Sequence, residues 1–208
     1  MMNEALIVID VQNDFCPGGA LAVTDGDSIL PQVNRLIAEF PHVILTQDWH
    51  PAGHSSFASA HPGTKPFDST TMPYGQQTLW PDHCIQGTSG ADFHDSLDWI
   101  RAELIVRKGF RPEIDSYSAF FENDRTTPTG LGGYLKERGI SKLAFCGLAL
   151  DYCVAYSALD AAKLGFEARV LVSACRGIDL GGSVATMTAQ MQDAGVTLVQ
   201  ESFNGRQN

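Results

Sequence analysis

The chain has 208 residues, of which 44% are hydrophobic and 18% are charged, and it carries a formal net charge of −10 with a pI near 4.9. This composition is typical of a globular protein with a substantial core. An acidic chain without a basic stripe is poorly suited to nucleic acid or to an anionic membrane surface, so we expect neither partner.

The amino-terminal segment is charge-poor and lacks the basic start and long apolar core of a signal peptide. No uninterrupted apolar stretch of the sequence approaches membrane-spanning length. The five cysteines are odd in number and contain no CxxC pair, which favours a reducing compartment. Together these features predict a cytoplasmic protein. A homo-oligomer remains open, because the sequence does not separate an interface from the core.

Six apolar runs are predicted to be buried strands. They are near-continuous rather than alternating, which is typical of parallel strands that are covered on both faces. In chain order they span residues 5–11, 43–46, 104–106, 143–146, 168–172 and 197–199.

Helical patterns lie between several of these runs. The first, residues 28–39, carries an apolar stripe, and Asp27 precedes it as a candidate cap. The other three span residues 130–138, 152–164 and 183–194, and each ends at a glycine that favours a helix C-terminus: Gly139, Gly165 and Gly195.

This alternation predicts one α/β domain over residues 1–208, with a central, mostly parallel six-stranded sheet between two layers of helices. Residues 47–96 break the rhythm, because they are rich in His, Pro, Gly, Ser and Thr and show little periodicity. So long an irregular stretch in a compact domain is usually functional. We expect it to carry residues of a metal site and a substrate site.

Ligands of an open α/β sheet bind beyond the carboxyl ends of its strands. Reactive side chains follow four of the predicted strands. They are Asp10, Asp48 with His50, Lys108 and Cys153.

Asp48 and His50 stand at i and i+2, on one side of an extended segment, and His54 and His83 lie in the same irregular region. A carboxylate with two imidazoles suits a divalent transition metal that keeps open positions for water or substrate. We therefore predict that Asp48, His50 and His83 are metal ligands, and His54 stays open as a fourth. Zinc is favoured, and iron and manganese are compatible with the same ligands.

The segment 145–154 contains the candidate nucleophile. A predicted strand reaches Gly147, and Cys153 falls in the first turn of the helix that follows, where unpaired N–H groups and the helix dipole favour a thiolate. Asp10 and Lys108 are the remaining groups that could serve as its base and cationic partner. Taken singly, a strand-end cap and a solvated surface cation are the more common roles of such residues.

Four aromatic residues lie close to these segments in the sequence, and together they favour a slot for a small flat ring. They are Phe15, Trp80, Tyr117 and Tyr152.

The residues together resemble the nicotinamidase/pyrazinamidase family of the isochorismatase-like cysteine hydrolases. The resemblance covers nearly the whole chain and is carried by segments 7–15, 46–51, 80–84 and 147–154, with 106–109 aligning with the family's lysine. One departure is Leu150, where the family often has Thr.

The resemblance implies a Rossmann-like strand order and a catalytic triad of Cys153, Asp10 and Lys108. It implies metal ligation by Asp48, His50 and His83. It also implies a cis peptide between Leu148 and Ala149, and an oxyanion site made by the backbone N–H groups of Ala149 and Cys153. The residues that it assigns to substrate binding are Phe15, Leu21, Trp80, Tyr117 and Tyr152.

The implied reaction converts nicotinamide to nicotinate and ammonia through a thioester on Cys153, with pyrazinamide as a further substrate, in NAD salvage. Three other readings stay open: an amidohydrolase for a carbamoyl or ureido compound, a vinyl ether hydrolase of the isochorismatase type, and a binding module without catalysis. The metal cluster and Trp80 favour a pyridine ring over the first reading, and Cys153 argues against the second.

Overall fold

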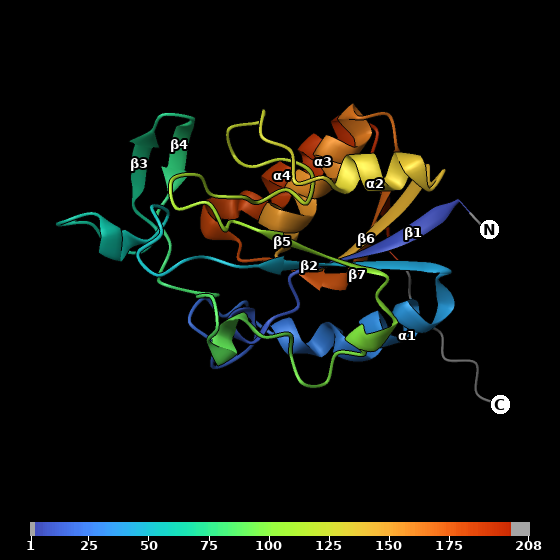
Figure 1. Ribbon diagram of the computed structural model, residues 1–208, viewed down its shortest axis with the longest axis horizontal. Helices are drawn as coiled ribbons and strands as arrows, with labels where there is room; N and C mark the ends of the chain where they lie inside the picture. The colour runs from blue at the N-terminus through green and yellow to red at the C-terminus, as the bar shows by residue number, and fades with distance from the viewer. Residues whose placement is uncertain (1–2, 201–208) are drawn as a thin grey trace.

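The structure is a computed structural model that describes residues 3–200. Six strands form one sheet in the order β5-β2-β1-β6-β7-β8, and every neighbouring pair is parallel (Figure 1). This confirms the predicted α/β class and the Rossmann-like order. The strands are β1 Glu4–Ile9, β2 His42–Asp48, β5 Leu104–Lys108, β6 Lys142–Leu148, β7 Glu167–Arg176 and β8 Thr197–Val199.

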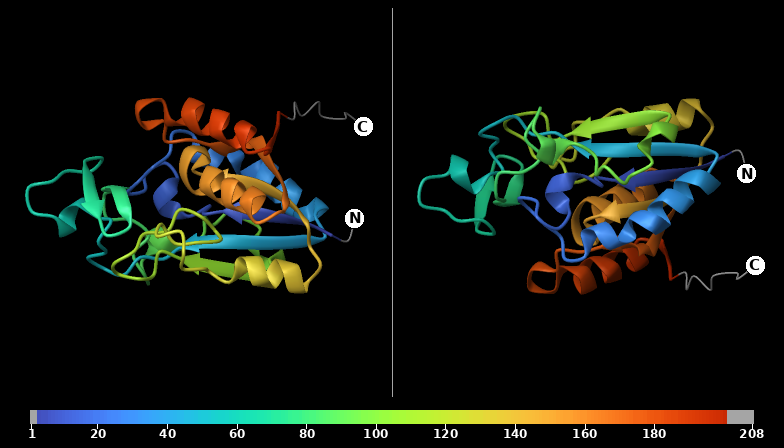
Figure 2. Two further views of the ribbon diagram at one scale, coloured as in Figure 1. Left: turned by 90° about the horizontal axis from the view of Figure 1, so that it is seen from above. Right: turned by 90° about the horizontal axis from the view of Figure 1, so that it is seen from below.

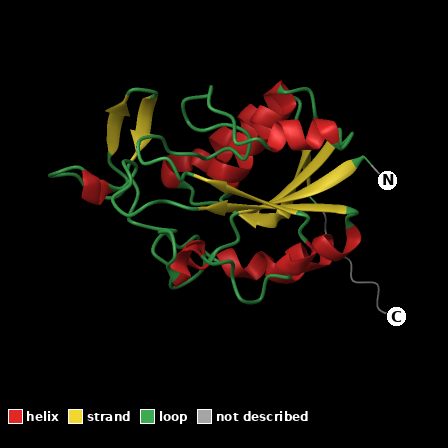
Figure 3. Cartoon of the chain, in the orientation of Figure 1, coloured by secondary structure: helices red, strands yellow, loops and turns green. Residues whose placement is uncertain are grey.

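Helices cover both faces of the sheet. Helix α1, Leu30–Glu39, lies on one face, and α2, Leu131–Glu137, α3, Ala155–Lys163, and α4, Ser183–Asp193, lie on the other (Figures 1 and 3). No helix within residues 3–200 has both the length and the apolar character needed to cross a bilayer.

Several predicted helix ends can be compared with the structure. Asp27 is not the cap of α1, because it lies inside a 3-10 turn, Gly26–Ile29, and α1 begins after Ile29 without a side-chain cap. The three helix-ending glycines are confirmed, since each is left-handed and its N–H donates to a carbonyl of the last turn: Gly139, Gly165 and Gly195.

The irregular region between β2 and β5 contains a small antiparallel hairpin, β3 Ser69–Met72 and β4 Gly75–Thr78. Its residues are mostly polar and carry no apolar alternation, which is why the sequence did not indicate strands there. The hairpin projects beyond the carboxyl ends of the sheet strands (Figure 2).

The order in which strands are added to the sheet reverses between β1 and β6. These two strands are parallel neighbours although they are far apart in sequence. From β1 the chain continues toward β2 and β5, whereas from β6 it continues toward β7 and β8. A crevice opens at such a switch point beyond the carboxyl ends of the strands. Asp10 and the turn that follows Leu148 meet at this crevice.

The close approach of β1 and β6 depends on Gly147, where the pairing of β6 with β7 also shifts register. Its φ is +117°, and a Cβ placed there would overlap the carbonyl of Ile9. We expect Gly147→Ala to lower the free energy of unfolding by more than ~3 kcal/mol, because either the strands must separate or the backbone must leave its left-handed conformation.

Gly165→Ala is the matched control, since Gly165 also has positive φ, +88°, but no atom lies within 4 Å of its added Cβ. Its cost should be limited to the backbone preference, roughly 1–2 kcal/mol. Denaturant unfolding of both variants measures the difference. Equal losses would contradict the packing argument.

Candidate active site and metal centre

Lys108, the last residue of β5, is the central residue of the site, and its side chain is completely buried. The Nζ atom lies 2.8 Å from Oδ2 of Asp10, 3.2 Å from Oδ1 of Asp48 and 3.4 Å from Sγ of Cys153. It also donates to the carbonyl of Ser116 at 2.9 Å. One ammonium thus contacts the carboxylate after β1, the carboxylate at the end of β2 and the thiol after β6.

The buried charges around Lys108 shift one another's pKa values. Burial lowers the pKa of Lys108, but Asp10 and Asp48 more than offset this and raise it well above its usual value. Burial raises the pKa of Asp10, although the Lys108 ammonium opposes the shift. A carboxylate with a raised pKa accepts a proton more readily, which suits a general base.

Asp10 is held in place from β2. Its φ is +46°, so the chain leaves the extended conformation at this residue and β1 ends at Ile9. The hydroxyl of Thr46 donates to Oδ1 of Asp10 at 2.6 Å, and the backbone N–H of Asp10 donates to the same hydroxyl at 3.2 Å. The other carboxylate oxygen is therefore left to face Lys108.

Cys153 lies in a turn that joins β6 to α3. The Leu148–Ala149 peptide is cis, as the resemblance implies, and a π-helical turn, Leu150–Val154, precedes α3. The N–H groups of Tyr152 and Val154 both donate to the carbonyl of Ala149 at 3.1 Å. The turn places Cys153 at the crevice, and such turns are frequent at functional sites.

Burial of Cys153 opposes the thiolate that a helix start would favour. Burial raises the pKa of Cys153 well above its usual value, and Lys108 opposes the shift only in part. The cysteine lies in the buried π-turn rather than at an exposed helix start, so loss of solvent outweighs the favourable charge. A thiol with a raised pKa needs a nearby base before it can act as a nucleophile.

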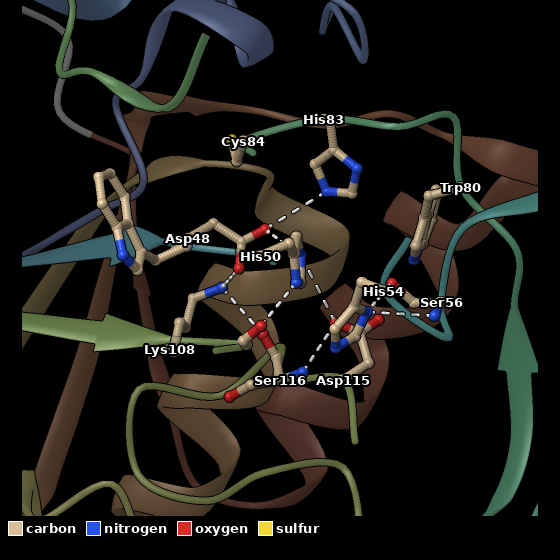
Figure 4. Close-up of polar contacts among 12 residues, drawn as sticks. Asp48, His50, His54, Ser56, Trp80, His83, Cys84, Lys108, Asp115 and Ser116 are labelled. Atoms are coloured by element: carbon tan, nitrogen blue, oxygen red, sulfur yellow. Dashed lines mark hydrogen bonds and ion pairs between the residues drawn. The ribbon is translucent and has the colours of Figure 1, made fainter. Parts of the chain in front are cut away.

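The predicted metal ligands converge at the end of β2 (Figure 4). Nε2 of His50 and Nε2 of His83 lie 3.0 Å and 3.3 Å from Oδ2 of Asp48. Nδ1 of His50 donates to the carbonyl of Gly109, and Nδ1 of His83 donates to that of Pro81, each at 2.8 Å. Both rings therefore present Nε2 to the carboxylate.

These atoms fit a divalent transition metal. In the protein alone, burial would raise the pKa of Asp48, but His50 and Lys108 lower it well below its usual value. Burial would lower the pKa of His50, but Asp48 raises it. Two imidazole nitrogens and a carboxylate oxygen at this separation thus favour a positive charge among them, and carbonyls fix both rings as is usual for metal ligands.

His54, which stayed open as a fourth ligand, is engaged at both ring nitrogens. Its Nδ1 accepts the backbone N–H of Ser56 at 3.1 Å, and its Nε2 donates to the carbonyl of Arg111 at 2.8 Å. Burial and the neighbouring His50 lower the pKa of His54, so the neutral ring is favoured. The lone pair of Nδ1 is thus engaged by an N–H group, although His54 also groups with His50 and Asp115 as a second set of possible metal ligands. Its ring packs beside that of His50.

A pocket opens between the metal cluster and Cys153. All five residues assigned to substrate binding line it, together with Ala149 and Cys153. Trp80 stands edge-on to Tyr152, with ring centroids 4.9 Å apart, and its indole N–H donates to the hydroxyl of Tyr117 at 3.1 Å. Mainly aromatic walls that also include Cys153 suit a small flat ring.

Two residues that line the pocket were missed at the sequence level. Asp115 follows β5 in an irregular segment, and its Oδ1 lies 3.8 Å from Nε2 of His50. Ile178 comes two residues after the end of β7. Because ligands of such a sheet bind beyond the carboxyl ends of its strands, the position of Ile178 after a predicted strand could have indicated it. Nothing in the spacing distinguishes Asp115 from other loop carboxylates.

Comparison with known proteins gives consistent relatives. The Isochorismatase domain profile matches residues 4–202. The chain is 54% identical over 194 residues to a nicotinamidase of Acinetobacter baylyi, an alignment that covers 93% of this chain and 91% of that protein.

Two solved structures extend the comparison. A nicotinamidase pyrazinamidase of Acinetobacter baumanii matches with a TM-score of 0.95 at 56% identity, over 96% of this chain and 97% of that one. The pyrazinamidase of Pyrococcus horikoshii in complex with zinc matches with a TM-score of 0.77 at 36% identity, over 96% of this chain and 99% of that one.

The fold and the site define a hydrolase of the three-layer α/β class with a buried cysteine at the switch point of its sheet. The chain belongs to the isochorismatase family, as the sequence resemblance indicated.

Gly109 offers a test of the metal cluster. Its φ is +65°, and a Cβ there would lie 2.5 Å from Cε1 of His50 and 3.0 Å from Oδ1 of Asp48. We expect Gly109→Ala to weaken zinc binding by about 10–100-fold, because the added methyl group would displace the His50 ring. That ring donates its Nδ1–H to the carbonyl of Gly109. Calorimetric titration of metal-free protein with zinc measures this.

Gly139→Ala is the control for backbone strain, because Gly139 has nearly the same φ, +68°, and open space around its added Cβ. Zinc affinity should be unchanged in that variant. Equal affinity in both variants would show that the Gly109 contact does not set the position of His50.

Proposed function

We propose that this protein is a nicotinamidase, which hydrolyses nicotinamide to nicotinate and ammonia and accepts pyrazinamide as well. The observation that carries the proposal is the buried ammonium of Lys108, which contacts Cys153, Asp10 and Asp48 at once. This contact would join a nucleophile, a base and a metal cluster beside one aromatic pocket. The identity of 54% to a curated nicotinamidase supports the choice of substrate.

The pyridine ring would lie between Phe15 and Trp80, with its carboxamide toward Cys153. Both side chains line the pocket, and Phe15 is edge-on to the His83 ring at a centroid distance of 5.5 Å. A divalent metal held by Asp48, His50 and His83 would supply a Lewis-acidic site for the ring nitrogen. Leu21, Tyr117 and Tyr152 would complete the walls.

Asp10 would take the proton of the Cys153 thiol, and Lys108 would stabilise the thiolate by charge pairing. The sulfur would then attack the carboxamide carbon, and the N–H groups of Ala149 and Cys153 would donate to the oxyanion. Asp10 would return its proton to the departing ammonia. Water would hydrolyse the resulting thioester, with Asp10 again as the base, and release nicotinate.

Zinc is the metal that we propose, since the pyrazinamidase of P. horikoshii binds it and a carboxylate with two imidazoles suits it. Iron and manganese are compatible with the same ligands. We further propose that the enzyme works in the cytoplasm in the salvage of nicotinamide toward NAD, because all five of its cysteines are free and the site depends on a reduced thiol.

Cys153→Ala should abolish ammonia release from nicotinamide, a loss of at least ~10⁴-fold in kcat, because no thioester can form. Zinc content should stay at the wild-type level, since Cys153 is not among the grouped ligands. Cys175→Ala is the control, because Cys175 is also a buried free cysteine but lies on β7. Turnover retained by Cys153→Ala would exclude the covalent mechanism.

Removal of the metal by a chelator should abolish nicotinamide hydrolysis, because the pyridine ring of the substrate then loses the metal that binds it beside Cys153. Addition of zinc should restore the activity.

His83→Ala should lower zinc affinity strongly, whereas His54→Ala should keep one zinc per chain. Elemental analysis and ammonia release measure both effects. A metal-loaded enzyme that is inactive on nicotinamide but active on a ureido compound would favour the rival amidohydrolase.

A further inference from the structure

A buried carboxylate lies next to the nucleophile although it does not line the pocket of Cys153. Asp151 is in the π-helical turn, two residues before Cys153, and its side chain is only 1% exposed. It borders a separate surface hollow on the other side of Tyr152. Asp151 has no role in the proposed reaction, so its hydrogen-bond partners indicate what it does there.

Three donors converge on this carboxylate. Oδ1 of Asp151 accepts the backbone N–H of Ile178 at 2.9 Å. Oδ2 accepts the backbone N–H of Asp179 at 2.8 Å and the hydroxyl of Ser183 at 2.5 Å. These bonds attach the nucleophile turn to the segment between β7 and α4.

That segment has an unusual backbone. Asp179, Gly181 and Gly182 all have positive φ, between +57° and +83°, so the chain does not form a regular ladder of its own there. It also packs tightly on the carboxylate, because a Cβ on Gly177 would lie 3.1 Å from Oδ1 of Asp151. An external acceptor therefore fixes where the segment sits.

The hydrogen bonds of Asp151 join two segments that both line the pocket. Ile178 lines it from the attached segment, and Tyr152 and Cys153 line it from the nucleophile turn. We propose that Asp151 is a positioning residue that fixes the distance between the Ile178 wall and Cys153 and thereby limits the size of the ring that the pocket accepts. The statement about ring size rests on the proposed function, whereas the statement about the wall does not.

Only a carboxylate satisfies this arrangement. All of its hydrogen-bond positions accept, whereas an asparagine at the same position has one acceptor oxygen and one NH₂ donor. Whichever way the amide is turned, its NH₂ faces the N–H of either Ile178 or Asp179. Asp151→Asn therefore leaves one backbone donor without an acceptor and should release the wall without a change in side-chain volume.

The experiment compares alkylation of Cys153 by iodoacetamide and by its bulky N-naphthyl analogue, with the modified peptide quantified by mass spectrometry. In Asp151→Asn the bulky-to-small rate ratio should rise about 10-fold, which corresponds to one lost hydrogen bond to a charged group. Partial unfolding would expose the buried thiol of Cys153 to both reagents, so the iodoacetamide rate would rise as well. A displaced wall should instead raise the rate of the bulky reagent and leave the iodoacetamide rate close to that of the wild type. This readout needs no amide substrate.

Asp124→Asn is the matched control. Asp124 also accepts two backbone N–H groups and a hydroxyl, from Thr126 and Thr127, and it does not line the pocket of Cys153. Its rate ratio should stay within about twofold of wild type, because these bonds lie within its own turn.

Steady-state kinetics give the second readout. For Asp151→Asn, selectivity in kcat/KM for nicotinamide over a nicotinamide with a bulky ring substituent should fall about 10-fold, mostly through KM. Ser183→Ala, which removes only the hydroxyl donor, should shift both readouts by roughly threefold in the same direction. This variant decides the question if Asp151→Asn does not fold.

An unchanged alkylation ratio in the folded variant overturns the role of Asp151. A raised ratio with no nicotinamide hydrolysis by the wild-type enzyme would overturn the proposed function and leave the role of Asp151 standing. A raised ratio with unchanged substrate selectivity would overturn the limit on ring size alone.

Discussion

The site depends on one buried charge. The Lys108 ammonium is fully removed from water, which costs several kcal/mol unless charged partners and hydrogen bonds offset it. Asp10, Asp48 and the carbonyl of Ser116 provide that offset, and the same contacts place the ammonium 3.4 Å from Sγ of Cys153. The positions of Asp10 and Asp48 are therefore conditions for keeping the lysine buried, and Cys153 is placed relative to both through the same ammonium.

The sheet supplies the frame for this charge. Because all six strands are parallel, residues at the ends of β1, β2, β5 and β6 reach the same edge, and the switch between β1 and β6 opens that edge to a ligand. The long segment between β2 and β5 then closes the edge from outside. It carries His50 and His83, which group with Asp48 as possible metal ligands, and Trp80, which lines the pocket.

Much of the fold could be predicted from sequence, because near-continuous apolar runs and helix-ending glycines are local signals. Helix and strand ends were less predictable. The first strand stops at Ile9 because Asp10 takes a left-handed conformation to face Lys108, a tertiary contact that has no local pattern. The hairpin Ser69–Thr78 was missed for the opposite reason, since its strands are polar and pair only with each other.

The sequence by itself determined the fold class and the family. It also indicated candidate residues for the chemistry, because the spacing along the chain matches the family's motifs for Asp10, Asp48, His50, His83, Lys108 and Cys153. Tertiary structure decided their state. It buries Cys153, which raises the pKa of its thiol, and it places hydrogen-bond partners at both ring nitrogens of His54. It also places the carboxylate of Asp151 against the backbone N–H of Ile178. These properties depend on burial and on groups distant in sequence, which no local pattern encodes.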